Sequence, residues 1–382
     1  MMRTQFVPDR TERKSADIIL VCLIILLLGM GLGILFSASY HRAQAVFKTP
    51  YYFIYRQCIW AALGLAAAFV LSRISLAFLN RITPFITGAS VLLMLFCFIP
   101  GIGPQIMGAR RWIVLFGYSI QPSEFAKVAL VLYLSRMLHR KQEKLCDFVN
   151  GFLPLAFVLV VFGVLTVLQN DFSTAIFMVL LGIAFFFIAN IKILYVAGFT
   201  LLAGLGGMAL LMTKSHRMAR VISFLNPGQD PSGADYQILA AKAALLKGGF
   251  WGTGIGQGTR KLGGLPEAHS DFIFAVCAEE IGFLGIAAVM ALFVLFAYKG
   301  YAIASGCGKN RYGFYLAFGI TTCIFCQALM NMAVVAGLVP ATGITLPFFS
   351  SGGSSLLATL ALSGLLVNLS RSEGVLEGGV YG

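Results

Sequence analysis

Runs of about twenty apolar residues recur along most of this chain and constrain its fold more than any other feature. The first run, residues 16–35, contains a single charged side chain, that of Asp17. A helix needs about 20 such residues to cross the hydrocarbon core of a bilayer. The sequence therefore predicts an all-α integral membrane protein with about ten transmembrane helices, at residues 16–38, 51–72, 82–100, 121–139, 149–168, 172–190, 193–213, 271–298, 312–337 and 346–369.

Composition excludes a soluble protein of this length. Of the 382 residues, 59% are hydrophobic and only 11% are charged, whereas soluble domains average about 25% charged residues. The first apolar run is long enough to span and is followed by no small-residue cleavage site, so no signal peptide is expected. The net charge of +13 comes from residues scattered through many loops. Because no basic arm or helix gathers them, no nucleic acid partner is expected.

The loop charges predict the orientation of the chain. An even number of spans puts both termini on one side of the membrane. Fifteen lysines and arginines fall on that side, and five fall in the short loops opposite, so the positive-inside rule places both termini in the cytoplasm. We expect a cytoplasmic tail at 1–15, a membrane domain at 16–369 and a cytoplasmic tail at 370–382. A long extracytoplasmic segment, 214–270, should join the seventh and eighth helices.

This long segment violates the local charge bias. Long loops can cross the membrane regardless of their charge, so the basic residues need no special explanation. The alternative is that an anion binds at the outer face. Residues 236–252 are typical of a short amphipathic helix along the outer interface. The basic residues of the segment are Lys214, Arg217, Arg220, Lys242, Lys247, Arg260 and Lys261.

Three patterns indicate no special chemistry. The stretch GTGIGQG, residues 252–258, does not fit the G-x-G-x-x-G dinucleotide fingerprint and favours a structural loop. The pair Cys323 and Cys326 lies inside an apolar run, where cysteines are usually small buried hydrophobes. No internal repeat argues for a transporter with inverted halves.

The stretch QPSEFAK opens the fourth predicted span. Pro122 suits the first position of a helix, and Glu124 in the first turn is favoured by the helix dipole. Lys127 lies one turn deeper, and an ammonium at the centre of a span costs roughly 2.5–3.5 kcal/mol on insertion scales. It needs a partner, which Glu124 can supply, or a wet cavity.

Two outer turns carry further candidates. In GARRW, Arg110 and Arg111 either anchor the chain at the interface or bind a phosphate. In LQNDFSTA, Asp171 either caps the following helix or takes part in a site.

The stretch LPFFSSGGSS, residues 346–355, predicts an irregular start to the last span. It contains Pro347, Gly352, Gly353 and four serines, including Ser354. Irregular backbone at membrane depth is tolerated only where it lines a protein-walled or watery cavity, so a cavity is expected here.

The stretch GGLPEAHSDFIFAVCAEEIGFLG, residues 263–285, places three carboxylates at the mouth and inside of an apolar helix. Asp271 either caps that helix or performs chemistry, together with the nearby His269 and the basic outer segment. At 100° per residue, Glu279 and Glu280 lie about 80° and 180° round the helix from Asp271. The three cannot share one site, and Glu280 is expected to be a buried hydrogen-bonding group.

Five stretches together resemble the SEDS family (shape, elongation, division and sporulation) of RodA and FtsW proteins. GARRW, QPSEFAK, LPEAHSDFIF with AEE, QALMN with GLVPATG, and LPFFSSGGSS occur in the family's order and span nearly all the chain. The resemblance implies a peptidoglycan glycosyltransferase that polymerises lipid II at the outer face of the cytoplasmic membrane. It also implies a class B penicillin-binding protein as partner, within the divisome or the elongasome.

The resemblance also implies roles for particular residues. Asp271 matches the family's essential acidic residue, Glu124 and Lys127 match its Q-P-S-E-x-x-K pair, and Arg220 matches the arginine before S-F-L-N-P. Departures from the pattern are Ser270, Asn170 and Ser351, where the family more often has Thr, Pro and Tyr. Ala341 with Thr342 resembles elongation-type members. GTRKLGGLPEAHSDF, with Lys261, resembles division-type members, and we favour the FtsW branch.

The expected mechanism joins these residues. Arg110, Arg111, Lys127, Arg220 and Lys261 would bind the diphosphate of lipid II, with or without a divalent cation such as Mg²⁺ or Mn²⁺. Asp271 would act as general base for an inverting transfer with undecaprenyl diphosphate as leaving group. No organic cofactor is expected. Supporting roles fall to Glu124, His269, Glu280, Asp171 and Ser354. A lipid II flippase and a non-enzymatic division scaffold remain the alternatives.

Overall fold

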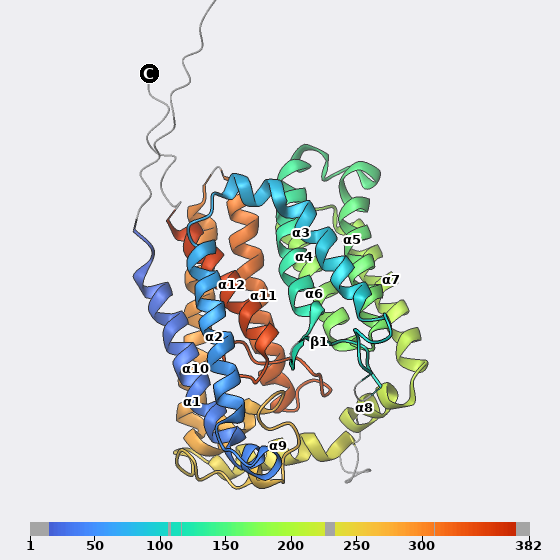
Figure 1. Cartoon of the computed structure of the whole chain (residues 1–382). Coiled ribbons are helices and arrows are strands. Elements are labelled where there is room, and N and C mark those ends of the chain that lie inside the picture. The colour runs from blue at the N-terminus through green and yellow to red at the C-terminus, as the bar shows by residue number, and fades with distance from the viewer. Residues whose placement is uncertain (1–14, 106–107, 116, 226–233, 309, 372–382) are drawn as a thin grey trace, which may run out of the picture.

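A computed structural model of the chain describes residues 15–105, 108–115, 117–225, 234–308 and 310–371. Within these residues, ten long helices run side by side in one bundle (Figure 1). Eight of the described helices are long and apolar enough to cross a membrane. The apolar helix α6 has 17 residues, and α4 carries buried charges. The ten helices are α1 (Ile18–Phe47), α2 (Tyr52–Leu71), α3 (Leu76–Phe96), α4 (Pro122–Arg140), α5 (Leu153–Leu168), α6 (Phe172–Ile188), α7 (Ile193–Met212), α10 (Ile273–Gly306), α11 (Arg311–Val335) and α12 (Gly353–Ser370).

The predicted all-α membrane fold is confirmed, and the helix boundaries differ in two informative places. The eighth predicted span begins at Ile273 and extends to Gly306, well beyond the predicted end. The last span begins at Gly353 rather than 346. The preceding stretch is irregular, as predicted, and Phe348 adopts a left-handed conformation with φ of 67°.

Shorter elements gather in the connections. Strands β1 (Ile113–Leu115) and β2 (Tyr118–Ile120) form an antiparallel hairpin in which Val114 pairs with Ser119. The segment predicted to lie outside the membrane contains α8 (Ser215–Leu225), α9 (Ala234–Gly248) and the 3₁₀ turn η3 (Arg260–Leu262). Between α4 and α5 lie the 3₁₀ turn η1 (Gln142–Lys144) and the π-helical turn η2 (Phe148–Phe152).

Helix α12 occupies the centre of the bundle and packs most extensively against α2. The close approach depends on a small residue, because a Cβ atom at Gly364 would lie 2.4 Å from Cα of Ala68. Small residues commonly allow such contacts between membrane helices. Helix α7 is peripheral, with Val196 as its buried residue, and it stands at the edge of the bundle (Figure 1).

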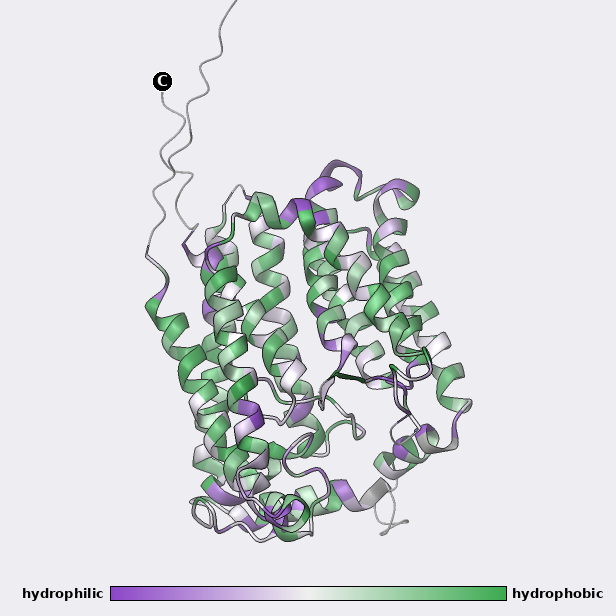
Figure 2. Cartoon of the chain, in the orientation of Figure 1, coloured by the Kyte–Doolittle hydropathy of each residue, from purple (hydrophilic) through white to green (hydrophobic). Residues whose placement is uncertain are grey.

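The described ends of the chain meet at one end of the bundle. The backbone N–H of Asp17 donates to Ser370 Oγ at 3.2 Å, and Lys299 Nζ lies 2.9 Å from the Asp17 carboxylate. Hydrophobic residues line the helices, while hydrophilic residues gather in the loops at both ends (Figure 2). The predicted tails 1–15 and 370–382 lie almost entirely outside the described residues.

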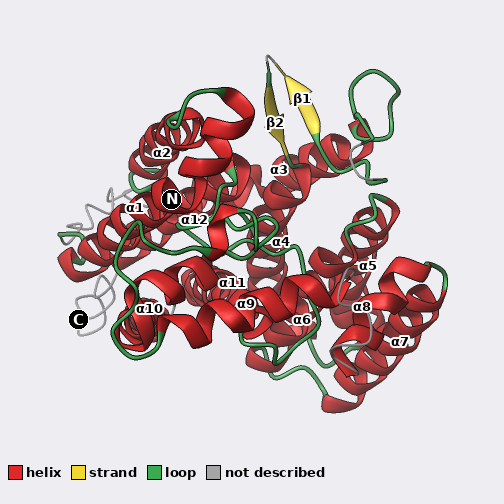
Figure 3. Ribbon diagram, turned by 90° about the horizontal axis from the view of Figure 1, so that it is seen from below, coloured by secondary structure: helices red, strands yellow, loops and turns green. Residues whose placement is uncertain are grey.

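Helices α8 and α9 lie at the opposite end of the bundle (Figure 1). Helix α9 crosses this end beneath α10 and α11 (Figure 3) and buries Ile238, Ala241 and Ala244. A helix was predicted here from the amphipathic pattern, and the structure confirms it.

Candidate active site

A cavity of about 950 Å³ opens at the same end of the bundle as α8 and α9. Its volume lies in the range of about 300–1,000 Å³ typical of ligand pockets. The irregular stretch before α12 forms part of its wall, as predicted for that stretch. Among the described residues, five basic and three acidic side chains line it: Arg56, Arg111, Lys214, Arg217, Arg220, Asp171, Glu267 and Asp271.

Asp271 lies in the loop directly before α10 and lines this cavity. Three contacts hold the backbone around it. Asn331 Nδ2 donates to the carbonyl oxygen of Asp271 at 2.8 Å. Ser350 Oγ donates to the carbonyl oxygen of Ser270 at 2.7 Å, and the N–H of Ser351 donates to that of His269 at 2.9 Å. Residues from α11 and from the stretch before α12 therefore hold the backbone that carries the Asp271 carboxylate.

The helix-cap explanation of Asp271 is wrong. Helix α10 begins at Ile273 with Phe272 at the N-cap position, and no side chain caps it. The Asp271 carboxylate instead accepts from Ser270 Oγ at 3.1 Å and is partly exposed to the cavity. The carboxylate is therefore available to interact with a ligand in the cavity.

Electrostatics suit Asp271 to proton transfer near neutral pH. Burial raises the pKa of Asp271 to about 6, with Glu267 adding to the rise. The hydrogen bond from Ser270 and the charges of Arg111 and Arg220 act in the opposite direction. A general base works best when its pKa lies close to the operating pH.

His269 does not line the cavity. Its side chain is buried, with its ring 4.5 Å from that of Phe53. Burial lowers the pKa of His269 to about 4, so the imidazole is neutral at physiological pH. Its backbone carbonyl oxygen accepts from the N–H of Ser351, which lines the cavity.

Arg111 is the arginine of GARRW that reaches the cavity. Its guanidinium stacks on Trp112 at 4.2 Å and lies 3.9 Å from the Asp171 carboxylate. A Cβ atom placed on Gly343 would lie 3.5 Å from Asp271 Oδ2 and 3.9 Å from Arg111 Nη1. Arg111 and Asp271 therefore both approach Gly343 on the cavity wall. Arg110 is exposed and is absent from the described lining.

Asp171 caps α6, as one of its two alternatives predicted, and it also lies on the cavity wall. Its Oδ1 accepts from the N–H of Thr174 at 3.3 Å and so caps α6. Its Oδ2 accepts from Gln121 Nε2 at 3.1 Å, and the residue lines the cavity. The hydroxyl of Ser354, also on the cavity wall, accepts from the Gln121 N–H at 3.0 Å.

Glu124 and Lys127 lie behind the cavity wall. Lys127 Nζ is 2.9 Å from Glu124 Oε2 and 2.6 Å from Gln327 Oε1. Gln327 Nε2 donates to the carbonyl oxygen of Thr345 at 3.0 Å, and Thr345 lines the cavity. Both charged side chains are buried. The predicted pairing exists, and Lys127 reaches the cavity through Gln327 rather than directly.

Basic residues on and just before helix α8 line another part of the cavity wall. Arg220 was predicted, and its Nη1 lies 3.5 Å from the carbonyl oxygen of Ala341. Arg217 and Lys214 join it on the cavity lining. Among the seven basic residues of the outer segment, these two carried no individual prediction. Arg217 and Arg220 stand three residues apart on α8 and share a helix face, and Lys214 directly precedes the helix. Arg56, on α2, was also missed and gave no comparable signal.

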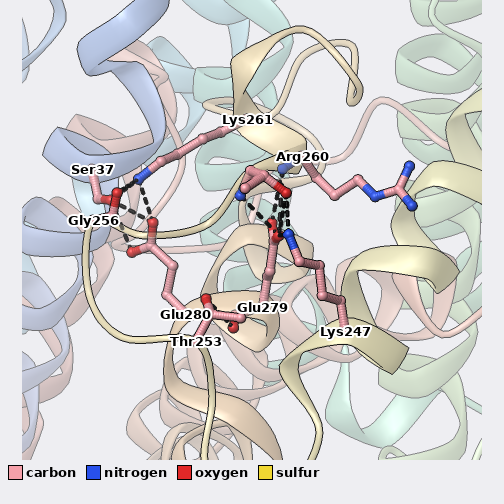
Figure 4. A network of polar contacts seen from close by, with 9 residues as sticks. Ser37, Lys247, Thr253, Gly256, Arg260, Lys261, Glu279 and Glu280 are labelled. Atoms are coloured by element: carbon pink, nitrogen blue, oxygen red, sulfur yellow. Dashed lines mark hydrogen bonds and ion pairs between the residues drawn. The ribbon is translucent and has the colours of Figure 1, made fainter.

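Lys261 does not reach the cavity, contrary to the predicted diphosphate contact. Its Nζ lies 2.5 Å from Glu280 Oε1, 2.7 Å from Ser37 Oγ and 2.9 Å from the carbonyl oxygen of Gly256 (Figure 4). Both charged side chains are buried. Glu280 neutralises Lys261, so this lysine is structural, and Glu280 is the buried hydrogen-bonding group that was expected.

Glu279 fastens the neighbouring part of the outer segment. It accepts from the N–H groups of Thr259 at 2.9 Å and Arg260 at 3.1 Å, and Lys247 Nζ lies 3.2 Å away (Figure 4). The two adjacent glutamates thus attach different residues of the outer segment to α10. Glu279 binds Thr259, Arg260 and Lys247, and Glu280 binds Lys261.

The glycine stretch crosses α10 where that helix is broken. Gly282 has φ of 66° and ψ of −170°, a conformation that only glycine readily adopts. The N–H groups of Thr253 and Gly254 donate to the carbonyl oxygens of Glu279 at 2.9 Å and Glu280 at 3.0 Å. The stretch thus supplies N–H donors to carbonyl groups of α10 next to the break at Gly282. This supports the interpretation of the stretch as a structural loop.

The described residues do not form a metal site from protein ligands alone. Within the described residues, no three His, Cys, Asp or Glu side chains are grouped closely enough to hold an ion. Mg²⁺ is often held by one or two carboxylates together with substrate phosphates. Asp271 fits that shared arrangement.

The fold and the cavity define a polytopic membrane protein with a charged cavity at one end of its bundle. Residues 18–374 match the FtsW/RodA/SpoVE family, described as cell cycle proteins, and the chain belongs to this family. The predicted resemblance is confirmed.

Individual relatives agree with this assignment. "Probable peptidoglycan glycosyltransferase FtsW" from a Geobacter species is 39% identical over 358 residues, which cover 94% of this chain and 97% of that protein. A solved structure described as the structural coordination of polymerization and crosslinking by a peptidoglycan synthase complex has a TM-score of 0.75 and 29% identity, covering 93% of this chain and 98% of its own. The rod shape determining protein RodA of Thermus thermophilus has a TM-score of 0.69 and 26% identity, covering 94% of this chain and 98% of its own. The relative named FtsW agrees with the predicted branch.

Proposed function

We propose that this protein is a peptidoglycan glycosyltransferase that polymerises lipid II at the outer face of the cytoplasmic membrane during cell division. The observation that carries the proposal is the placement of Asp271, with a pKa of about 6, in the same cavity as Arg111 and other basic side chains. The names of its relatives support the same activity.

The proposed reaction assigns one task to each side of the cavity. Arg111, Arg217 and Arg220 bind the diphosphate of the donor lipid II through charge-assisted hydrogen bonds. Asp271 accepts the proton of the acceptor sugar hydroxyl while its oxygen attacks the anomeric carbon of the donor. The new glycosidic bond forms as the bond to undecaprenyl diphosphate breaks, with inversion at that carbon. General-base help of this kind contributes about 10²–10⁴ in rate.

A divalent cation, Mg²⁺ or Mn²⁺, fits this scheme as a substrate-bound ion near Asp271. It would neutralise charge that develops on the leaving diphosphate. Buried Lys127 supports the cavity wall through Gln327 and Thr345 instead of contacting the diphosphate.

The membrane orientation is part of the proposal. The end of the bundle that holds Asp17 and Ser370 faces the cytoplasm, as the loop charges predict. The cavity end then faces outward, where a class B penicillin-binding protein would crosslink the new strands. The peptidoglycan synthase complex among the structural relatives supports such a partner.

The deciding experiment measures lipid II polymerisation by the purified protein with its transpeptidase partner and Mg²⁺ or Mn²⁺. Asp271→Asn should lose at least about a hundredfold in rate, because the base is removed, while its thermal unfolding stays near that of the wild type. Asp147→Asn is the matched control, since Asp147 is exposed in the loop between α4 and α5.

An Asp271→Asn rate within threefold of wild type would remove Asp271 from the reaction. Fluorescent lipid II that crosses liposome membranes without forming polymer would instead favour the flippase. Normal growth with neutral variants at both Asp271 and Lys127 would favour the scaffold.

A further inference from the structure

A second hollow, of about 460 Å³, adjoins the cavity at the start of α2. We propose that it binds sugar residues of the growing glycan strand as the strand leaves the cavity. The inference rests on the proposed function. This hollow, named here the tyrosine pocket, is lined by Tyr51, Tyr52, Tyr55 and Tyr118 with Thr49, Arg56 and Gly117.

The tyrosine pocket is continuous with the active-site cavity. Tyr52 and Arg56 line both spaces, as does Gly117 in the β1–β2 turn. Trp60, on the cavity wall, meets the ring of Tyr118 edge-on at 6.1 Å. An aromatic wall therefore leads from the reaction site to the pocket, along a path that a product strand can follow.

The chemistry of the lining matches a carbohydrate. A sugar ring offers a face of C–H groups, which packs on the electron-rich face of an aromatic ring, and a rim of hydroxyls, which needs polar partners. Tyrosine supplies both an apolar ring and a hydroxyl. None of the described lining residues is aliphatic, whereas an acyl-chain site would be mostly aliphatic.

Contacts within the protein hold the rings of Tyr52 and Tyr118 in the tyrosine pocket. Arg56 lies between two rings, 5.3 Å from the centroid of Tyr52 and 4.5 Å from that of Tyr118. Its Nη1 donates to Tyr52 Oη at 2.5 Å and its Nη2 to the carbonyl oxygen of Gly117 at 2.6 Å. Tyr52 also stacks on Phe47 at 3.6 Å. These contacts fix the rings before any ligand arrives, which lowers the entropy lost on binding.

Tyr55 provides the most accessible platform. It is 68% exposed, and Tyr298, near the opposite end of the bundle, is also 68% exposed. Tyr298 therefore serves as a control tyrosine of equal exposure outside both cavities.

The first measurement uses a soluble, lipid-free peptidoglycan tetrasaccharide and the full chain in nanodiscs. Tyr55→Ala combined with Tyr118→Ala should weaken tetrasaccharide binding at least about fivefold, because two stacking faces are lost. Tyr55→Phe keeps the ring and should bind within about twofold of wild type. Tyr298→Ala should bind like wild type.

The second measurement follows polymer length. The double variant should make the first coupling product at a rate within about twofold of wild type and should release shorter strands, because only the elongated product reaches the pocket. Unchanged tetrasaccharide binding and strand length in the double variant would overturn the inference. So would a loss confined to the first coupling, which would assign the pocket to the lipid-linked donor. A wild type that binds tetrasaccharide through these tyrosines and makes no polymer would overturn the proposed function alone.

Discussion

The ammonium group of Lys127 lies 2.9 Å from the carboxylate of Glu124, one turn away on α4, and both side chains are buried. Each charge compensates the other in a region where an isolated charge is costly. Gln327 then connects the pair to the backbone of Thr345 on the cavity wall. The pair therefore positions the wall against which substrate would bind.

A double-variant cycle tests this arrangement. Glu124→Gln or Lys127→Met alone should lower the free energy of unfolding by about 3–5 kcal/mol, because each leaves a buried charge without its partner. Glu124→Gln with Lys127→Met should lose less than the sum of the two. Denaturant titration in detergent micelles measures these values. Losses that simply add would contradict coupling between the two side chains.

The pKa of Asp271 predicts a pH profile for polymerisation. Burial raises this pKa to about 6, and only the ionised carboxylate can accept a proton. Activity should be half-maximal near pH 6, about tenfold below its plateau at pH 5, and constant above pH 7. His269, with a pKa lowered to about 4, stays neutral throughout this range and adds no inflection. Initial rates at constant ionic strength test the prediction, and a flat profile from pH 5 to 8 would refute it.

The adjacent arginines of GARRW provide a matched pair of variants. Arg111→Ala should lower kcat/KM for lipid II roughly 10- to 150-fold, since a charge-assisted hydrogen bond contributes about 1.5–3 kcal/mol. Arg110→Ala should stay within about threefold, because Arg110 is exposed and outside the described cavity lining. Equal losses in the two variants would show that the cavity geometry does not govern substrate binding.

Lys261 should behave as a structural residue. Lys261→Met strands Glu280 and should lower the free energy of unfolding by about 3–5 kcal/mol. The fraction that remains folded should keep the KM of wild type for lipid II, because Lys261 contacts Glu280, Ser37 and Gly256 rather than the cavity. Lys261→Met with Glu280→Gln should recover part of the stability. A raised KM without loss of stability would restore the anion-binding prediction.

Several features could be predicted because they depend on neighbours in the sequence. The ten apolar segments follow from the length and composition of each run. The irregular start of the last span follows from Pro347 and the glycines after it. The Glu124–Lys127 pair follows from a spacing of three residues on one helix, and the cap on α6 follows from Asp171 standing directly before Phe172.

Other features depend on which segments meet in space. Lys261 has the same charge as Arg220, and only the packing of the outer segment onto α10 gives it Glu280 as a partner. Asp271 stands where a cap is expected, yet Asn331 and Ser350, from distant parts of the chain, hold its backbone so that the carboxylate turns toward the cavity.

The sequence by itself determined the membrane-spanning elements, their number and the family, because each rests on local apolar runs and ordered motifs. Only the tertiary structure decided which charges face the cavity and which are neutralised behind it. A charged side chain in a low-dielectric interior is governed by the groups within a few ångströms of it, and packing brings together residues as far apart as Ser37, Lys261 and Glu280.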